Sequence, residues 1–152
     1  MKVLVLAGHH VHELLPYAEC ADVMRGALVG LARGSIEQPL RTMIHLRHAP
    51  GFMGLMPAHS PSIGYGLKAL CITPGNPAIG KDSHQGGVLL FAADTGEPLA
   101  LVNASAVTEI RTAAVSAVAT GLLLGRAPPS WPSSAPASRR GRTRTPWWRR
   151  AR

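Results

Sequence analysis

The stretch Val107-Thr-Glu-Ile-Arg-Thr-Ala-Ala-Val-Ser-Ala-Val-Ala-Thr120 decides how this chain folds. Its apolar residues recur at the three- and four-residue spacing of a helix, which predicts a helix over about 104–124. Arg111 stands among small side chains near the N-terminal end, where the helix dipole favours an anion and a guanidinium can bind a carboxylate in a fork. An Arg that simply extends from a packed face to solvent is the alternative interpretation.

Working outward from this helix, the preceding residues read as strands and then as a second helix. An amphipathic helix is predicted over 16–33, with Gly34 just beyond its end, from an apolar stripe at helical spacing that consists of Tyr17, Ala21, Met24, Leu28 and Leu31. A short strand is expected at Lys2–Leu6. Further strands are expected where apolar or β-favouring residues stand between Gly and Pro, at Leu40–Leu46, Phe52–Met56, Leu67–Thr73, Gly87–Ala92 and Leu99–Val102.

The order of these elements predicts an α+β fold, with helices flanking a mostly antiparallel sheet. Asn103 or Ser105 is suited to cap the last helix. No GxGxxG motif follows a strand in this sequence. The Rossmann unit that such a motif would open is therefore not expected.

Three cations lie within otherwise apolar elements, at Arg41, Lys68 and Arg111. A lysine buried in an apolar strand is costly unless it is paired, so the convergence of the three on one anionic ligand would explain their positions. Simpler interpretations remain. Arg41 would be an exposed cross-strand charge, and Lys68 would point outward from an edge strand.

Several short motifs occur in one order with the helix motif: Gln38-Pro-Leu-Arg-Thr42, Gly54-Leu-Met-Pro-Ala58, Gly66-Leu-Lys-Ala69, Pro74-Gly-Asn-Pro77, Ser83-His-Gln-Gly86 and Leu89-Leu-Phe91. Over about residues 3–125 the chain resembles the ornithine cyclodeaminase/mu-crystallin family. The resemblance implies a homodimer that uses NAD or NADP for hydride transfer at the Cα–N bond of a small amino or imino acid. Family members are amino-acid cyclodeaminases or ketimine reductases.

The resemblance also implies site residues. Arg41, Lys68 and Arg111 would hold the substrate carboxylate, and Ser83 and Arg111 would approach the nicotinamide cofactor. No residue matches the family's acid/base aspartate, so no catalytic residue is assigned. The chain is expected to be a truncated member, without turnover on its own.

The segment Gly51–Pro57 has no carboxylate, although one is expected there in ornithine cyclodeaminases to hold the second amine. The resemblance therefore favours imino-acid reductases over ornithine cyclodeaminases.

Cysteine and histidine usage adds two expectations. Cys20 and Cys71 form no CxxC pair, which indicates free thiols in a reducing cytoplasm. His9, His10 and His12 lack companion ligands at a recognisable spacing, so no metal site is expected. The apolar run 113–124 is shorter than a membrane span, and no membrane association is expected.

The composition changes sharply near Gly125. Residues 1–125 contain eight Lys or Arg and all eight acids, whereas residues 126–152 contain eight Arg, three Trp and no acid, so the net charge of +8 belongs to the tail. The tail lacks Leu, Ile, Val and Phe and is expected to be disordered. An Arg/Trp arm on a small β-rich module would bind nucleic acid, and this is the alternative function. Since GC-rich codons read out of frame produce the same composition, we favour an out-of-frame origin.

Overall fold

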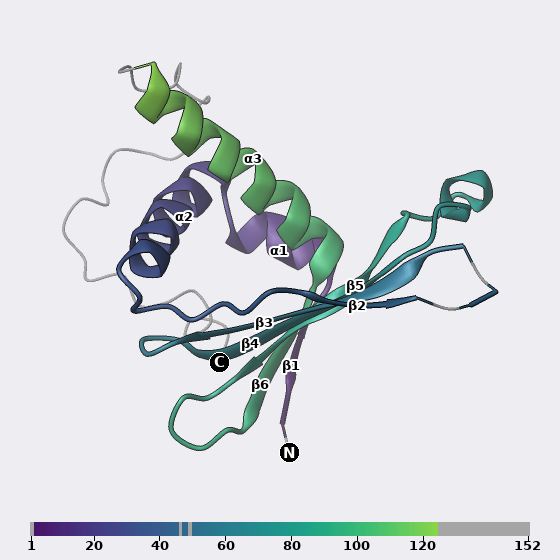
Figure 1. Ribbon diagram of the computed structural model, residues 1–152, viewed down its shortest axis with the longest axis horizontal. Coiled ribbons are helices and arrows are strands. Elements are labelled where there is room, and N and C mark those ends of the chain that lie inside the picture. Colours follow the sequence, from purple (N-terminus) through teal and green to yellow (C-terminus); the bar gives the residue numbers. More distant parts are fainter. Residues whose placement is uncertain (1, 46, 49, 125–152) are drawn as a thin grey trace.

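A six-stranded mixed sheet with three helices on one side of it forms the part of the chain that the computed structural model describes, residues 2–45, 47–48 and 50–124 (Figure 1). The strand order is β1-β6-β5-β4-β3-β2, and every neighbouring pair is antiparallel except β1 with β6. The elements in chain order are β1 Leu4–Leu6, α1 Gly8–Leu14, α2 Tyr17–Ala32, β2 Thr42–His45, β3 Phe52–Ser60, β4 Gly64–Ile72, the 3₁₀ turn Asn76–Ile79, β5 His84–Phe91, β6 Pro98–Asn103 and α3 Ala104–Leu123.

The α+β class and the positions of both long helices are confirmed. The main difference is β3, which was expected to stop before Pro57 and instead continues to Ser60. Its outer neighbour β2 pairs only with Phe52–Leu55, so Pro57 lies where that side of β3 is no longer part of the β2 ladder. A proline is tolerated there because its missing N–H removes no hydrogen bond to β2.

The predicted cap of α3 and the predicted glycine after α2 are both confirmed. Asn103 ends β6 and caps α3, accepting a hydrogen bond of 3.0 Å from the backbone N–H of Ala106. Gly34 follows α2 with a φ of 71°, a conformation that costs glycine little. Because no loop separates β6 from α3, the first turns of α3 are held directly over the sheet.

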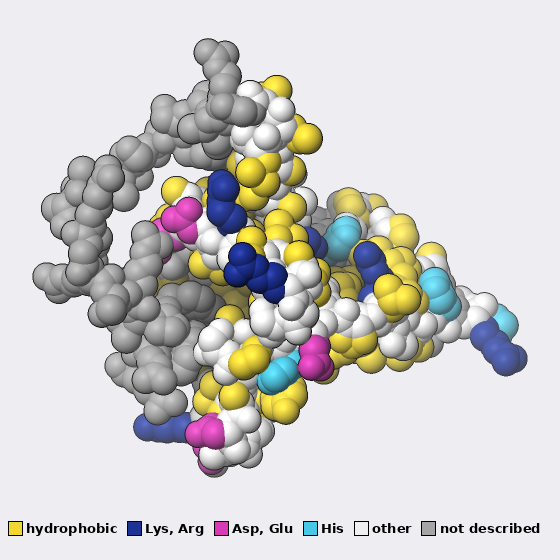
Figure 2. All heavy atoms as spheres, turned by 60° about the vertical axis from the view of Figure 1, so that its left-hand side comes forward, with side chains coloured by type: hydrophobic (Ala, Val, Ile, Leu, Met, Phe, Trp, Pro, Cys, Tyr) yellow, Lys and Arg dark blue, Asp and Glu magenta, His cyan; other side chains and the backbone are white. Residues whose placement is uncertain are grey.

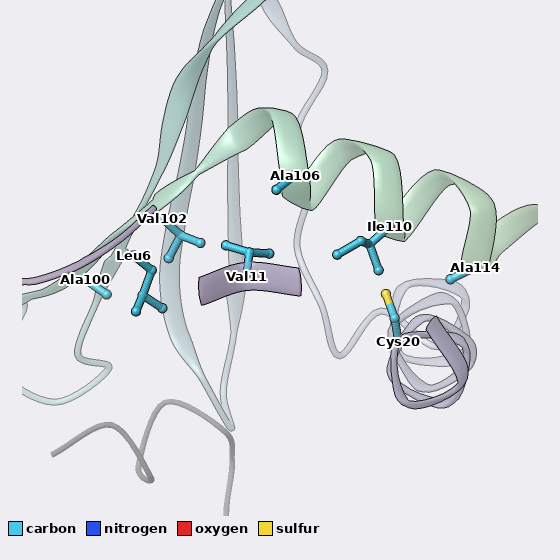
Figure 3. Packing of buried hydrophobic residues seen from close by; sticks show 8 residues of the cluster. All are labelled: Leu6, Val11, Cys20, Ala100, Val102, Ala106, Ile110 and Ala114. Carbon is cyan, nitrogen blue, oxygen red and sulfur yellow. The ribbon is translucent and has the colours of Figure 1, made fainter. Parts of the chain in front are cut away.

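The core lies where α3 meets the other helices and the sheet (Figure 3). Ile110 has no exposed surface and points between α1 and α2, and the thiol of Cys20 on α2 points toward it. Cys20 was absent from the apolar stripe expected for α2, whereas Leu28 and Leu31 in that stripe are exposed. The predicted buried face of α2 is only partly confirmed, because α2 packs on α3 rather than on the sheet.

By length and composition alone α3 is apolar enough to cross a membrane. Ile110, Ala114 and Val118 on one face of it are nevertheless buried in the described domain. That burial is typical of a core helix.

The two faces of the sheet differ in what covers them. One row of paired side chains, Leu6, Val102, Val88, Lys68 and Met56, faces the helices. The next row, Val5, Leu101, Leu89, Leu67 and Pro57, lies on the opposite face, which we call the open face. Val5 is 64% exposed and Leu101 43% exposed. Figure 2 shows apolar side chains over much of the strand region.

The predicted boundary near residue 125 and the predicted tail 126–152 lie outside the described residues.

Replacing Ile110 by Ala should lower the free energy of unfolding by about 2–5 kcal/mol, because it leaves a cavity at a fully buried contact of three helices. Urea denaturation followed by circular dichroism measures the change. Leu122→Ala is the matched control, since Leu122 lies on the same helix and is 66% exposed. Equal losses in the two variants would contradict the position of the core.

Candidate functional site

A pocket of about 410 Å³ lies between the helix-facing side of β2, β3 and β4 and the first turns of α3. Its floor comes from strands and its upper wall from the helix. Its lining residues are Gln38, Pro39, Leu40, Arg41, Met43, Phe52, Met56, Lys68, Leu70, Ile72, His84, Thr108 and Arg111. Three of them are the cations that the sequence analysis singled out, and none is acidic.

Strand register explains why the cations lie close together. Lys68 on β4 pairs with Met56 on β3. Thr42 pairs with Leu55, so Arg41, one residue earlier, lies beside Met56 on the same side as Lys68. Arg111 reaches the pocket from above, on α3. Arg41 was expected within a strand, but β2 begins one residue later and Arg41 is exposed.

Lys68 is half-buried on an interior strand, so the interpretation of an outward-pointing edge lysine is wrong. Its ammonium donates a hydrogen bond of 2.5 Å to the hydroxyl oxygen of Thr108 on α3. Burial lowers the pKa of Lys68 below its ordinary value, and the positive charge of Arg111 lowers this pKa further. The site therefore holds two cations that repel each other, and a bound anion would relieve that repulsion.

Aliphatic and aromatic side chains line the other end of the pocket. Leu70 and Ile72 follow Lys68 on the same face of β4, and Phe52 and His84 pair with Ile72 from either side. Ile72 lies four residues beyond Lys68, about 13 Å along the strand. A molecule that spans this pocket would therefore meet cations at one end and aliphatic or aromatic side chains at the other.

His84 lines the pocket, whereas Ser83, which the family resemblance assigned to the cofactor, is not among the lining residues. The Ser83 hydroxyl lies 3.0 Å from Nδ1 of His84. Ser105 on α3 donates a hydrogen bond of 2.5 Å to the carbonyl of His84, which ties this end of β5 to the helix. Neither His84 nor Thr108 was expected at the site, although both lie inside motifs that carry the family resemblance.

Within the described ranges, no group of three His, Cys, Asp or Glu side chains is placed to hold a metal ion. Cys20 and Cys71 are both free thiols in this part of the chain. Of the three histidines of α1, His12 lies across from α3, with its Nε2 3.8 Å from a carboxylate oxygen of Glu109.

The sequence model of the ornithine cyclodeaminase/mu-crystallin family matches residues 1–127. The ketimine reductase mu-crystallin of Mus musculus is 40% identical over 91 residues, which are 59% of this chain and 29% of the mouse protein. The chain thus spans less than a third of this relative.

Two solved structures share the fold described here. The Δ¹-pyrroline-2-carboxylate reductase of Thermococcus litoralis, in complex with NADH and L-proline, has a TM-score of 0.74 and 32% identity over 78% of this chain and 37% of that one. A lysine cyclodeaminase that recognises L-lysine, L-ornithine and L-2,4-diaminobutyric acid has a TM-score of 0.70 and 31% identity, over 81% and 39%. The comparisons give no support to the nucleic-acid-binding alternative.

Replacing Lys68 by Met should leave the free energy of unfolding at pH 7 unchanged or raise it. The lowered pKa means that the folded state disfavours the charged ammonium, so stability should rise with pH from that lowered pKa up to the ordinary value of 10.5. Methionine removes the charge while filling similar space. Urea denaturation between pH 6 and 10 measures both effects. A variant clearly less stable at pH 7, or one that keeps the wild-type pH slope, would contradict this assignment.

Proposed function

Because this chain belongs to the ornithine cyclodeaminase/mu-crystallin family, we propose that its described domain binds a small amino or imino acid for an NAD(P)-dependent reductase. The observation that carries the proposal is that Arg41, Lys68 and Arg111 line one pocket whose lining residues include no acid. Guanidinium and ammonium groups bind a carboxylate through charge-assisted hydrogen bonds. The three cations would hold the carboxylate and point the rest of the substrate toward Leu70 and Ile72.

The substrate class that fits this pocket is a cyclic imino acid rather than a diamino acid. A second ammonium group would need a carboxylate partner, and the pocket is lined by none. The apolar side chains nearest the cations instead suit the methylene groups of a ring, because Met43 and Leu70 contribute mainly dispersion contacts. The Thermococcus relative, bound to L-proline, is an example of a family member with a cyclic ligand.

For the cofactor we propose NAD or NADP, which would supply the hydride to the Cα–N bond. Arg111 and Ser83 are the described residues that we assign to it. Arg111 is exposed at the pocket while Lys68 beneath it is half-buried, so the guanidinium can meet both a carboxylate and a group above it. We place the protein in the cytoplasm, where Cys20 and Cys71 would stay reduced.

We further propose that two copies associate through the open face of the sheet. The row from Val5 to Pro57 crosses five strands without a charged residue. A second hollow of about 300 Å³ lies beside it, lined in part by Pro57, Tyr65, Leu67 and Phe91. Contiguous exposed apolar surface of this kind marks a protein interface.

Replacing Arg111 by Ala should weaken the binding of pyrrole-2-carboxylate by about tenfold or more, the usual effect of losing a charge-assisted pair. Isothermal titration calorimetry on the 152-residue chain measures the affinity. Pyrrole, which lacks the carboxylate, should bind no better to the wild type than to the variant. Arg25→Ala on the exposed face of α2 is the control. No binding by the wild type, or equal binding by both Arg variants, would reject the proposed function.

Replacing Leu101 by Lys should convert a dimer into a monomer, because it places a charge within the apolar row of the open face. Light scattering coupled to size-exclusion chromatography gives the mass. Leu122→Lys, on a helix away from that face, should stay dimeric. A monomeric wild type, or a dimeric Leu101→Lys variant, would show that the open face is not the interface.

A further inference from the structure

Thr108 on α3 makes two hydrogen bonds at once. Its hydroxyl donates to the backbone carbonyl of Ala104 at 2.5 Å, one turn earlier on the same helix. The same oxygen lies 2.5 Å from Nζ of Lys68, forty positions away in the chain. Threonine commonly bonds the carbonyl four residues back in a helix, so the first contact needs no ligand to explain it.

The direction of both hydrogen bonds is fixed, since the ammonium of Lys68 can only donate and the Thr108 hydroxyl has a single hydrogen. That hydrogen is donated to Ala104, and the hydroxyl oxygen accepts from Lys68. One of the three ammonium hydrogens points up at the helix, and the other two are left for the pocket.

Based on these contacts, we propose that Thr108 is a positioning residue that holds the ammonium of Lys68 at the carboxylate-binding end of the pocket. The role of this contact in carboxylate binding rests on the proposed function. The contact itself rests on the described residues alone. Thr108 never needs to touch the substrate for the effect.

Charge explains why Lys68 needs such a partner. The titratable or charged groups that line the pocket with it are Arg41 before β2, His84 on β5 and Arg111 on α3, and none is an acid. Arg111 lies three residues after Thr108, on the same side of α3. The helix thus presents one group that repels the ammonium and, one turn away, one that accepts a hydrogen bond from it.

Loss of the hydroxyl should act through Lys68. Burial and Arg111 already lower the pKa of Lys68, and an accepted hydrogen bond opposes that shift by stabilising the charged form. Without the acceptor, the pKa of Lys68 should fall further and the ammonium should move. A carboxylate would then bind more weakly, most of all at alkaline pH where the amine loses its proton.

The test compares Thr108→Val with Thr108→Ser in the full 152-residue chain. Valine keeps the shape and removes the hydroxyl, and serine restores it. Thr120→Val is the matched control, the same change at an exposed site on the same helix. The sequence contains three lysines, Lys2, Lys68 and Lys81, so ¹³Cε-labelled lysine gives few signals, and Lys68→Met assigns the one that matters.

We expect Thr108→Val to lower the pKa of Lys68 by about half a unit or more, with Thr108→Ser and Thr120→Val close to the wild type. At alkaline pH the affinity for pyrrole-2-carboxylate should fall about threefold or more in Thr108→Val, the change in protonated fraction that half a pKa unit produces, and recover in Thr108→Ser. An unchanged pKa in a folded Thr108→Val variant would overturn the inference. If the wild type binds no carboxylate but the pKa of Lys68 still falls in Thr108→Val, the proposed function is wrong, and the positioning of Lys68 by Thr108 is supported.

Discussion

A lysine ammonium held half-buried on an interior strand is the constraint on which the rest of this site depends. The charge cannot retreat to solvent as it could at a sheet edge, and burial makes it costly. The structure offsets that cost with a helix hydroxyl from Thr108, and that hydroxyl is in place because α3 starts directly at the end of β6. The Asn103 cap, the buried Ile110 and the pocket above Lys68 all follow from how this helix begins and where it lies.

The two faces of the sheet have different roles: one forms the pocket, and the other is the proposed surface for self-association. Alternate residues on β4, Lys68 and Leu70, point toward the helices and line the pocket, while their neighbours Leu67 and Ala69 belong to the open face. A shift of one residue in the register of β4 would exchange these roles, placing the ammonium on the open face and a leucine under Arg111. Ligand binding and self-association would therefore depend on the same strand pairing.

Local patterns in the sequence were enough to predict where the helices and strands lie, but not which elements pack against one another. Helical spacing around Ile110 and the glycine after Arg33 gave both long helices nearly to the residue, since both signals lie within a few positions. The edge interpretation of Lys68 was wrong because strand order depends on pairings between distant segments. Thr108 was missed for the same reason, as its partner lies on another element. The family resemblance, not periodicity, brought Arg41, Lys68 and Arg111 together as a site.

The parallel pairing of β1 with β6 has a consequence for the order in which the chain can assemble. Strands β2 to β6 each pair with the next in sequence, so this meander can form from short-range contacts as synthesis proceeds. Leu4 pairs with Ala100, and that partner does not exist until most of the domain has been made. Strand β1 is thus made before the other strands of this sheet and is the last of them to be paired. Until then the edge of β6 is unprotected, and a neighbouring nascent chain could pair with it in place of β1.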